Sequence, residues 1–286
     1  MDYSLQVENI SKEYKAFKLD NLSFNLPHGA IMGFIGENGA GKTTTLKLIL
    51  NLIKRKSGNI KVFGLDNIKD EKIIKEKIGV VFDESYFHDT LNISDISLIM
   101  KNIYKNWDDK LYNSFTERFN LPENKNVKEF SRGMKMKLSI AAALSHKPEL
   151  LILDEATSGL DPVVRNDILD VFLDFIQEEN HSILISSHIT EDLERIADYI
   201  TFIHDGKIIF SENKDSVTEK NAILKCGTKA FDMIDKSDII SYKKNEFGYE
   251  ILIKNKEKCK IKYSNYTIDN ASLNDIMLFY AKGERK

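Results

Sequence analysis

The stretch GENGAGKTT, residues 36–44, constrains the fold more than any other part of the chain. Its spacing is G-x-x-x-x-G-K-T. It lies between the apolar run AIMGFIG (30–36) and the segment KTTTLKLILNLI (42–53), whose apolar residues recur at helical spacing. A glycine-rich turn between a strand and a helix aims backbone N–H groups at an anion, beside the positive end of the helix. The pattern therefore predicts a phosphate-binding loop.

The residue types in this loop suit a bound nucleoside triphosphate and its metal ion. Gly36 and Gly41 permit a tight backbone. Lys42 is placed to reach the β and γ phosphates, and the Thr43 hydroxyl is placed to ligate Mg²⁺. The alternative is a glycine-rich turn that matches the motif by chance, and the flanking strand and helix argue against it. The residues predicted to bind nucleotide here are Gly36, Asn38, Gly39, Gly41, Lys42, Thr43 and Thr44.

Two adjacent acids follow the apolar strand in LLILDEATSGLDP (150–162). Asp154, at the carboxyl end of that strand, can hold the Mg²⁺ shell, and Glu155 can polarise an attacking water. Neighbouring side chains on a strand point to opposite faces, so the two acids serve one site only if the strand ends there. The alternative is a pair of solvated carboxylates at a strand end.

Strand-like and helix-like segments alternate over most of the chain. This alternation predicts an α/β fold with a largely parallel central sheet and an inserted helical lobe. We predict a first domain over residues 1–211, with the helical part at about 84–145. Beyond residue 211 the balance of charge turns from net acidic to net basic, and we predict a small C-terminal α+β domain over residues 212–286.

Composition argues against several other classes of protein. A formal net charge of −3 gives no long-range field that would gather nucleic acid, so no nucleic-acid partner is expected. Cys226 and Cys259 lack the spacing of a disulfide framework or a zinc site, which fits a reducing cytosol. The apolar runs are far shorter than the ~18 residues of a membrane helix, and the N-terminus lacks a signal-peptide pattern. We therefore expect a chain that does not cross a membrane by itself.

Four further features accompany the phosphate loop and the acids in a fixed order. FSRGM (130–134) resembles the signature motif of ATP-binding-cassette (ABC) ATPases, and SGLD (158–161) resembles their D-loop. His188 stands where that family has its switch histidine, and Tyr14 stands where it places an aromatic ring against adenine. The resemblance extends from residue 3 to about residue 211.

The resemblance implies a P-loop NTPase of the ABC cassette type, with a RecA-like core, an antiparallel β subdomain and a helical subdomain, that binds ATP and Mg²⁺. In this family two cassettes meet head to tail, and the signature of one closes over the γ-phosphate held by the other. Ser131, Gly133 and Asp161 are thereby implied in nucleotide binding. Taken alone, SRG would be an ordinary helix cap and His188 a residue at the start of a helix. The residues implied in catalysis are Glu155, His188 and Lys42.

Two departures from the family pattern matter, one in the signature, where Phe130 and Met134 also replace leucine and glutamine, and one in the Q-loop. Arg132 stands where glycine is usual, but Ser131 and Gly133 on either side of it remain, so we expect contact with ATP to survive. IGVVFDES (78–85) puts Asp83 where the family's Q-loop has glutamine. A carboxylate can reach Mg²⁺ through a water, but it cannot donate a hydrogen bond as an amide does. We interpret Asp83 as a metal contact, with a plain turn residue as the alternative.

The wider pattern, including residues 130–165 and 187–208, resembles ATPase subunits of bacterial exporters of the bacitracin-resistance, lantibiotic-immunity and phenol-soluble-modulin group. The implied function is ATP hydrolysis that powers a separately encoded membrane permease, with export of peptides or antimicrobial compounds. The chain is expected in the cytoplasm, docked on the permease near residues 83–93, as a homodimer or as a heterodimer with another ABC ATPase subunit. The alternatives are a soluble ABC ATPase with a non-transport role and a nucleotide-gated regulatory module with little turnover.

The stretch KNKEKCKIK (254–262) alternates lysine with other residues. The alternation predicts a strand with five lysines on one face. We interpret it as an edge strand guarded against pairing with another sheet, with a patch for anionic lipid or phosphate as the alternative. The lysines concerned are Lys254, Lys256, Lys258, Lys260 and Lys262.

Overall fold

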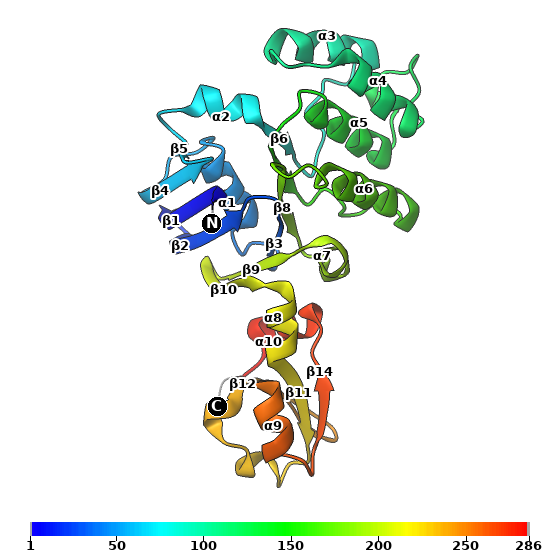
Figure 1. Cartoon of the computed structure of the whole chain (residues 1–286). Coiled ribbons are helices and arrows are strands. Elements are labelled where there is room, and N and C mark those ends of the chain that lie inside the picture. Colours follow the sequence, from blue (N-terminus) through cyan, green and yellow to red (C-terminus); the bar gives the residue numbers. More distant parts are fainter. Residues whose placement is uncertain (1, 285–286) are drawn as a thin grey trace.

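The computed structural model describes residues 2–284, and within them the strands form three sheets. The central sheet has the strand order β10-β9-β3-β8-β7-β6 (Figure 1), and its strands are parallel except β10, which pairs antiparallel with β9. Every residue of β3, β7 and β8 is buried, as expected for parallel strands that are covered on both faces. The strands are β3 (Ile31–Ile35), β6 (Ile78–Val81), β7 (Leu150–Asp154), β8 (Ser182–Ser187), β9 (Tyr199–His204) and β10 (Lys207–Asn213).

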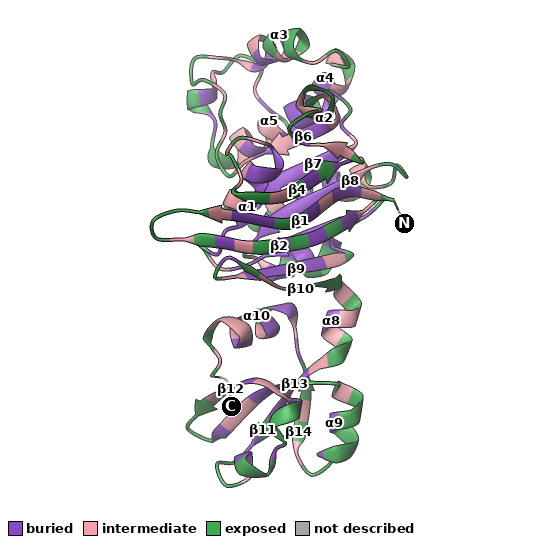
Figure 2. Cartoon of the chain, turned by 90° about the vertical axis from the view of Figure 1, so that its left-hand side faces the viewer, coloured by how far each residue is buried: buried purple, intermediate pink, exposed green. Residues whose placement is uncertain are grey.

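An antiparallel sheet with the order β2-β1-β4-β5 forms a second layer beside the central sheet (Figure 1). Buried and exposed residues alternate along β2, and its buried Leu22, Phe24 and Leu26 share one core with Phe34 of β3 and with α1 (Lys42–Ile49). Figure 2 shows the buried residues concentrated in these two sheets. The strands are β1 (Tyr3–Glu13), β2 (Lys18–Pro27), β4 (Ser57–Val62) and β5 (Leu65–Asp66).

The chain between β6 and β7 forms a helical lobe at the top of Figure 1. Its buried residues Ile96, Tyr112 and Leu138 belong to one core with the strands below, and the Tyr112 hydroxyl donates to the Ile93 carbonyl at 3.1 Å. Over residues 2–284 no helix has the length and apolar character needed to cross a bilayer. The helices of this half of the chain are α2 (Glu71–Lys77), α3 (Ile93–Ile103), α4 (Asp109–Arg118), the 3-10 turn η1 (Val127–Glu129), α5 (Arg132–Leu144), α6 (Pro162–Phe175) and α7 (Thr190–Ile196).

The arrangement confirms the predicted fold class: a parallel core, an antiparallel β subdomain and a helical subdomain. The two elements predicted beside the phosphate loop are also present, because the apolar run at 30–36 contains β3 and the segment at 42–53 begins with α1. A continuous apolar run indicates the first, and apolar residues at helical spacing indicate the second.

The C-terminal part, at the bottom of Figure 1, contains a third sheet in the order β12-β13-β11-β14. It has a small core of its own around Leu224, Ile251 and Cys259. Leu273 and Phe279 of α10, however, belong to the same core as Leu193 of α7. The division at residue 211 stays a prediction. The elements are α8 (Lys214–Lys220), β11 (Asn221–Cys226), η2 (Phe231–Met233), η3 (Lys236–Asp238), β12 (Ile239–Asn245), β13 (Gly248–Lys254), α9 (Lys256–Lys262), β14 (Thr267–Asn270) and α10 (Leu273–Lys282).

The prediction of a lysine-faced strand over residues 254–262 was wrong. The strand β13 ends at Lys254, Asn255 adopts a left-handed backbone with a φ of 57°, and the helix α9 follows. On a helix, residues four apart share a face, so Cys259 and Tyr263 both turn inward. The lysines are therefore distributed around a helix, and no single row of five exists to guard an edge or to bind an anion.

Candidate active site

The phosphate loop lies between the end of β3 and the start of α1. Its backbone passes through Gly41 with a φ of 112°, a conformation that glycine adopts without steric cost, and α1 begins at the next residue. The side chain of Lys42 is only 6% exposed. Its Nζ donates to the Gly36 carbonyl at 2.8 Å and lies 3.1 Å from Oε1 of Glu155. The loop therefore folds around its own lysine, which also reaches the acidic end of β7.

Asp154 and Glu155 are brought to one site by a turn of the backbone. The strand β7 ends at Asp154, and Glu155 has a φ of 53°. Asp154 is 2% exposed, accepts a hydrogen bond from the Ser186 hydroxyl at 2.5 Å, and is hydrogen-bonded to Thr43 of the phosphate loop. Burial raises the pKa of the Asp154 carboxyl, and the negative charges of Asp83 and Glu155 also raise it.

Glu155 lies between a cation and an imidazole. One carboxylate oxygen is 3.1 Å from Lys42 Nζ, and the other is 2.7 Å from Nδ1 of His188. The Glu155 side chain is 14% exposed and that of His188 is 41% exposed, so solvent reaches the group. A carboxylate in such a position can accept a proton from water. The structure thus brings together the three residues for which a catalytic role was predicted.

The residues predicted to hold Mg²⁺ provide a suitable but incomplete set of donors. A threonine hydroxyl and a buried carboxylate are in contact, and a second carboxylate, Asp83, is close enough to act on Asp154. These are the oxygen ligands that Mg²⁺ prefers. Within residues 2–284, however, no three His, Cys, Asp or Glu side chains are grouped as a metal cage. The residues fit an ion that takes its other ligands from phosphate and water, as Mg²⁺ does in nucleotide sites.

Tyr14, Asn38, Gly39 and Thr44 were also predicted to contact the nucleotide. Tyr14 lies in the connection between β1 and β2, 46% exposed, with Lys12 Nζ 5.1 Å from its ring centroid. The same turn touches the phosphate loop, because a Cβ on Gly41 would lie 2.9 Å from the ring of Phe17. Asn38 and Gly39 are exposed at the tip of the loop, and Thr44 is half-buried in the first turn of α1.

The signature and D-loop residues occupy two helix starts. Ser131 caps α5, and its hydroxyl accepts from the Met134 N–H at 3.2 Å. Asp161 caps α6 by accepting from two backbone N–H groups, at 3.1 and 3.0 Å. In the described part of the chain, no hydrogen bond or ion pair joins Ser131 or Gly133 to the phosphate loop. A single copy does not assemble these predicted contacts around one nucleotide.

Two groups of residues were not singled out from the sequence. The Ser186 hydroxyl donates to Asp154 and also accepts from the Glu155 N–H at 3.2 Å. Its position two residues before His188 is the sequence signal that could have identified it as a site residue. Asp192 of α7 is 2% exposed and lies 3.1 Å from Nε of Arg165. This second group ties the segment after β7 to the helix that follows His188, and no sequence spacing signals it.

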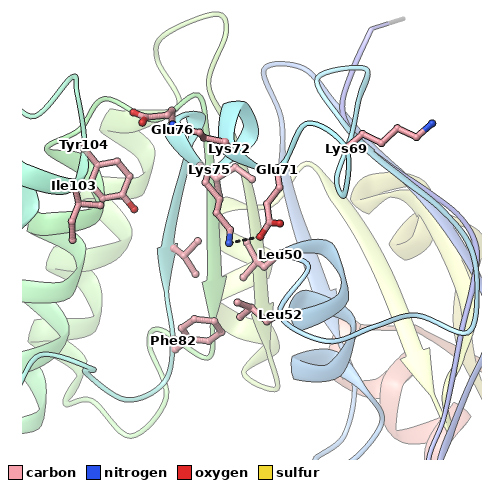
Figure 3. Close-up of a pocket in the computed structure, with 12 residues that line it drawn as sticks. Leu50, Leu52, Lys69, Glu71, Lys72, Lys75, Glu76, Phe82, Ile103 and Tyr104 are labelled. Carbon is pink, nitrogen blue, oxygen red and sulfur yellow. Dashed lines mark ion pairs between the residues drawn. The ribbon is translucent and has the colours of Figure 1, made fainter.

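A groove of about 710 Å³ lies between the end of α1, α2 and the helical lobe (Figure 3). Figure 3 shows Leu50 and Leu52 on one side and Ile103 and Tyr104 on the other. Leu52 and Ile103 are 52% and 59% exposed, so this apolar surface is open to a partner. Lysines and glutamates lie at the rim, and one of the lysines, Lys75, is paired with a glutamate of α2 at 2.5 Å.

Comparison with known proteins agrees with this geometry. A family model described as ABC transporter matches residues 19–158. The chain is 37% identical to the bacitracin transport ATP-binding protein BcrA of Bacillus licheniformis, over 77% of this chain and 73% of that protein. It is 35% identical to the lantibiotic transport ATP-binding protein SrtF of Streptococcus pyogenes, over 74% and 91%. A solved ATP binding subunit of an ABC transporter superposes with a TM-score of 0.68 at 25% identity, over 74% of this chain and 91% of that chain.

The fold, the buried Lys42 and Asp154, and the neighbouring Glu155 and His188 define a P-loop ATPase. The chain belongs to the ABC transporter family, in which it is an ATP-binding and ATP-hydrolysing member.

Proposed function

We propose that this chain powers a permease made as a separate polypeptide, and that the transport is export of peptides or antimicrobial compounds. The observation that carries the proposal is the meeting of Lys42, Glu155 and His188 at the carboxyl end of the parallel sheet, in a molecule that also has an open apolar groove. The similarity to bacitracin and lantibiotic transport proteins supports the choice of cargo.

In this proposal the residues around the phosphate loop divide the chemistry. Lys42 binds the β and γ phosphates, and Glu155 accepts the proton of the attacking water. His188 orients Glu155 and contacts the γ-phosphate. Mg²⁺, held by Thr43 and Asp154 and through water by Asp83, supplies charge neutralisation at the phosphate oxygens. The exposed ring of Tyr14 stacks on adenine.

Hydrolysis in this proposal requires two cassettes. In the described chain neither Ser131 nor Gly133 has a hydrogen bond to the phosphate loop, and the start of α5 offers a hydroxyl and backbone N–H groups to an anion. We therefore assign Ser131, Gly133 and Asp161 to the nucleotide bound by a neighbouring cassette, in a homodimer or with another ABC subunit. Binding of two ATP molecules closes the dimer and hydrolysis releases it.

The groove of Figure 3 is the proposed contact with the permease. It adjoins the segment 83–93, because Phe82 lines it. A permease segment with an apolar face would cover Leu52 and Ile103. The chain would then lie on the inner face of the cell membrane, held there by its partner.

The test is to purify the chain together with the membrane protein that it binds. ATP turnover by that complex is then measured with peptides and antimicrobial compounds added one at a time. Cargo should raise turnover in the complex and leave the isolated chain unaffected. A chain that co-purifies with no membrane protein would contradict the proposal.

A further inference from the structure

Arg132 is the first residue of α5, between the two residues assigned to the neighbouring nucleotide. Its guanidinium lies against the backbone of Gly159 in the D-loop. A Cβ at Gly159 would come within 2.7 Å of Nη1 and 3.1 Å of Cζ of Arg132. Gly159 also has a φ of 68°, which side-chain-bearing residues rarely adopt. The D-loop therefore leaves a space that the arginine fills.

Arg132 differs from the other arginines of residues 2–284 because its side chain has no hydrogen-bond or ion-pair partner. Each of the others bonds the side chain of an acid or an asparagine, at distances between 2.6 and 3.1 Å. Arg132 is exposed, and no hydrogen bond or ion pair in the described chain involves its side chain. Asp161, the acid of the D-loop, accepts hydrogen bonds from two backbone N–H groups of α6 at its Oδ1, and within residues 2–284 no hydrogen bond or ion pair joins it to Arg132. The cation is thus held in place by packing and left without an anion.

We infer that Arg132 binds the γ-phosphate of the ATP held by the neighbouring cassette. The inference rests on the proposed function, in which the start of α5 closes over that phosphate. A guanidinium offers paired N–H donors that match phosphate oxygens, and at the first position of a helix its charge adds to that of the helix terminus. Contact with Gly159 restricts the side chain before binding, so less conformational freedom is lost when the phosphate arrives. Arg132 thereby favours ATP over ADP as the nucleotide that closes the dimer.

The experiment uses the full chain with Glu155→Gln, so that bound ATP persists, and measures the ATP concentration at half-maximal dimerisation by light scattering. Arg132→Ala should raise that concentration about tenfold or more, as expected for loss of a charge-assisted hydrogen bond, and Arg132→Lys should raise it less. Lys125→Ala removes an exposed cation from the loop between α4 and η1 and should change nothing. The melting temperature of the nucleotide-free monomer and its affinity for ADP should be the same in all variants.

Phosphorus NMR of the dimer at saturating ATP identifies the anion. Arg132→Ala should shift the γ-phosphate resonance and leave the α-phosphate resonance in place. An unchanged γ resonance together with weakened dimerisation would mean that Arg132 pairs with a carboxylate of the neighbouring chain, and it would overturn the inference.

Gly159→Ala gives an independent check, because its methyl group would displace the guanidinium. In the Glu155→Gln chain, Gly159→Ala should raise the ATP concentration at half-maximal dimerisation. The increase should be smaller in a chain that also carries Arg132→Ala. Gly64→Ala is the matched control, since Gly64 has a similar φ of 77° but has no atom within 4 Å of the added methyl group. Equal effects of Gly159→Ala with and without Arg132 would contradict the inference.

The outcomes separate this inference from the function on which it rests. If the parent chain fails to dimerise with ATP, the shared nucleotide site is wrong and the role of Arg132 falls with it. If the parent and Arg132→Ala dimerise equally well, only the role of Arg132 is wrong. A lowered melting temperature in Arg132→Ala would show that the residue stabilises its own D-loop, and this too would overturn the inference.

Discussion

Nδ1 of His188 lies 2.7 Å from Oε2 of Glu155, while the other oxygen of the same carboxylate lies 3.1 Å from Lys42 Nζ. The residue that follows β7 is thus connected to both the phosphate loop and the segment after β8. The carboxylate is oriented from two sides and remains open to solvent. This is the geometry that a group needs in order to activate water beside a bound phosphate.

Glu155→Gln should lower steady-state ATP turnover about 100-fold or more, because an amide cannot accept the proton of the attacking water. Binding of a fluorescent ATP analogue should persist, since the phosphate loop is unchanged. Phosphate release and equilibrium binding measure the two quantities. Glu178→Gln, a change at an exposed glutamate, is the control. Equal phosphate release from wild type and Glu155→Gln would rule out the assigned role.

Leu52→Asp should weaken binding of the permease about tenfold or more, because it places a charge where an apolar side chain would be buried. Leu52 is 52% exposed in the isolated chain, so the melting temperature should hardly change. Phe247→Asp is the control, at a residue that is 91% exposed in the turn between β12 and β13. Co-purification from membranes reports the result, and undiminished recovery of the permease with Leu52→Asp would show that it docks elsewhere.

Asp192→Asn should stabilise the chain relative to wild type progressively as pH rises above about 4. Burial raises the pKa of the Asp192 carboxyl above 3.8, although Thr157 and Arg165 act in the opposite direction. Glu191 also raises this pKa and Arg195 lowers it. The native state therefore holds the proton more tightly than the unfolded chain. The protonated Asp192 carboxyl therefore contributes to stability below pH 3.8, and this contribution is lost as pH rises through the native pKa.

Urea unfolding of both proteins at several values between pH 4 and pH 7 measures this difference. Asp235→Asn is a control of opposite sign, because hydrogen bonds from Ser237 and Lys262 lower the pKa of that carboxyl to about 2. The contribution of Asp235 is present above 3.8 and lost only as pH falls toward 2, so its difference from wild type should be flat between pH 5 and pH 7. A gain of wild type over Asp192→Asn with rising pH would contradict the expected sign.

Leu273→Ala should lower the free energy of unfolding by about 2–5 kcal/mol, as a large-to-small change in a well-packed core does. Leu273 is fully buried in the core that α10 shares with α7, and its N–H donates to the Glu194 side chain at 2.8 Å. Ile261→Ala, at a residue that is 82% exposed, should cost less than about 0.5 kcal/mol. The prediction fails if Leu273→Ala has as small an effect as Ile261→Ala.

The parts of the fold that were predictable from sequence are those with a local signal. The phosphate loop and the acids of β7 depend on fixed spacing after apolar strands, and the parallel sheet followed from the alternation of strand and helix. A strand was wrongly predicted over residues 254–262 because every second residue there is lysine. Asn255 instead ends the strand β13 with a left-handed backbone conformation. Cys259, the buried residue of α9, packs in one core with residues that are distant in the sequence, such as Leu224.

The remaining features of the site arise from tertiary contacts alone. The two carboxylate oxygens of Glu155 contact Lys42 and His188, which lie more than thirty residues away on either side in the sequence. No local sequence pattern predicts these contacts. The same holds for the guanidinium of Arg132 on Gly159, which reads in the sequence only as a departure from a motif. A sequence shows which residues could act, whereas their mutual placement requires the fold.

The mass of the Glu155→Gln chain in solution, with and without Mg²⁺ and ATP, is the most direct test of the shared nucleotide site. Light scattering should give 32.9 kDa without nucleotide and about twice that value with ATP, and the increase should disappear when Lys42→Ala is added. A chain that binds ATP and stays at 32.9 kDa at high protein concentration would contradict the account.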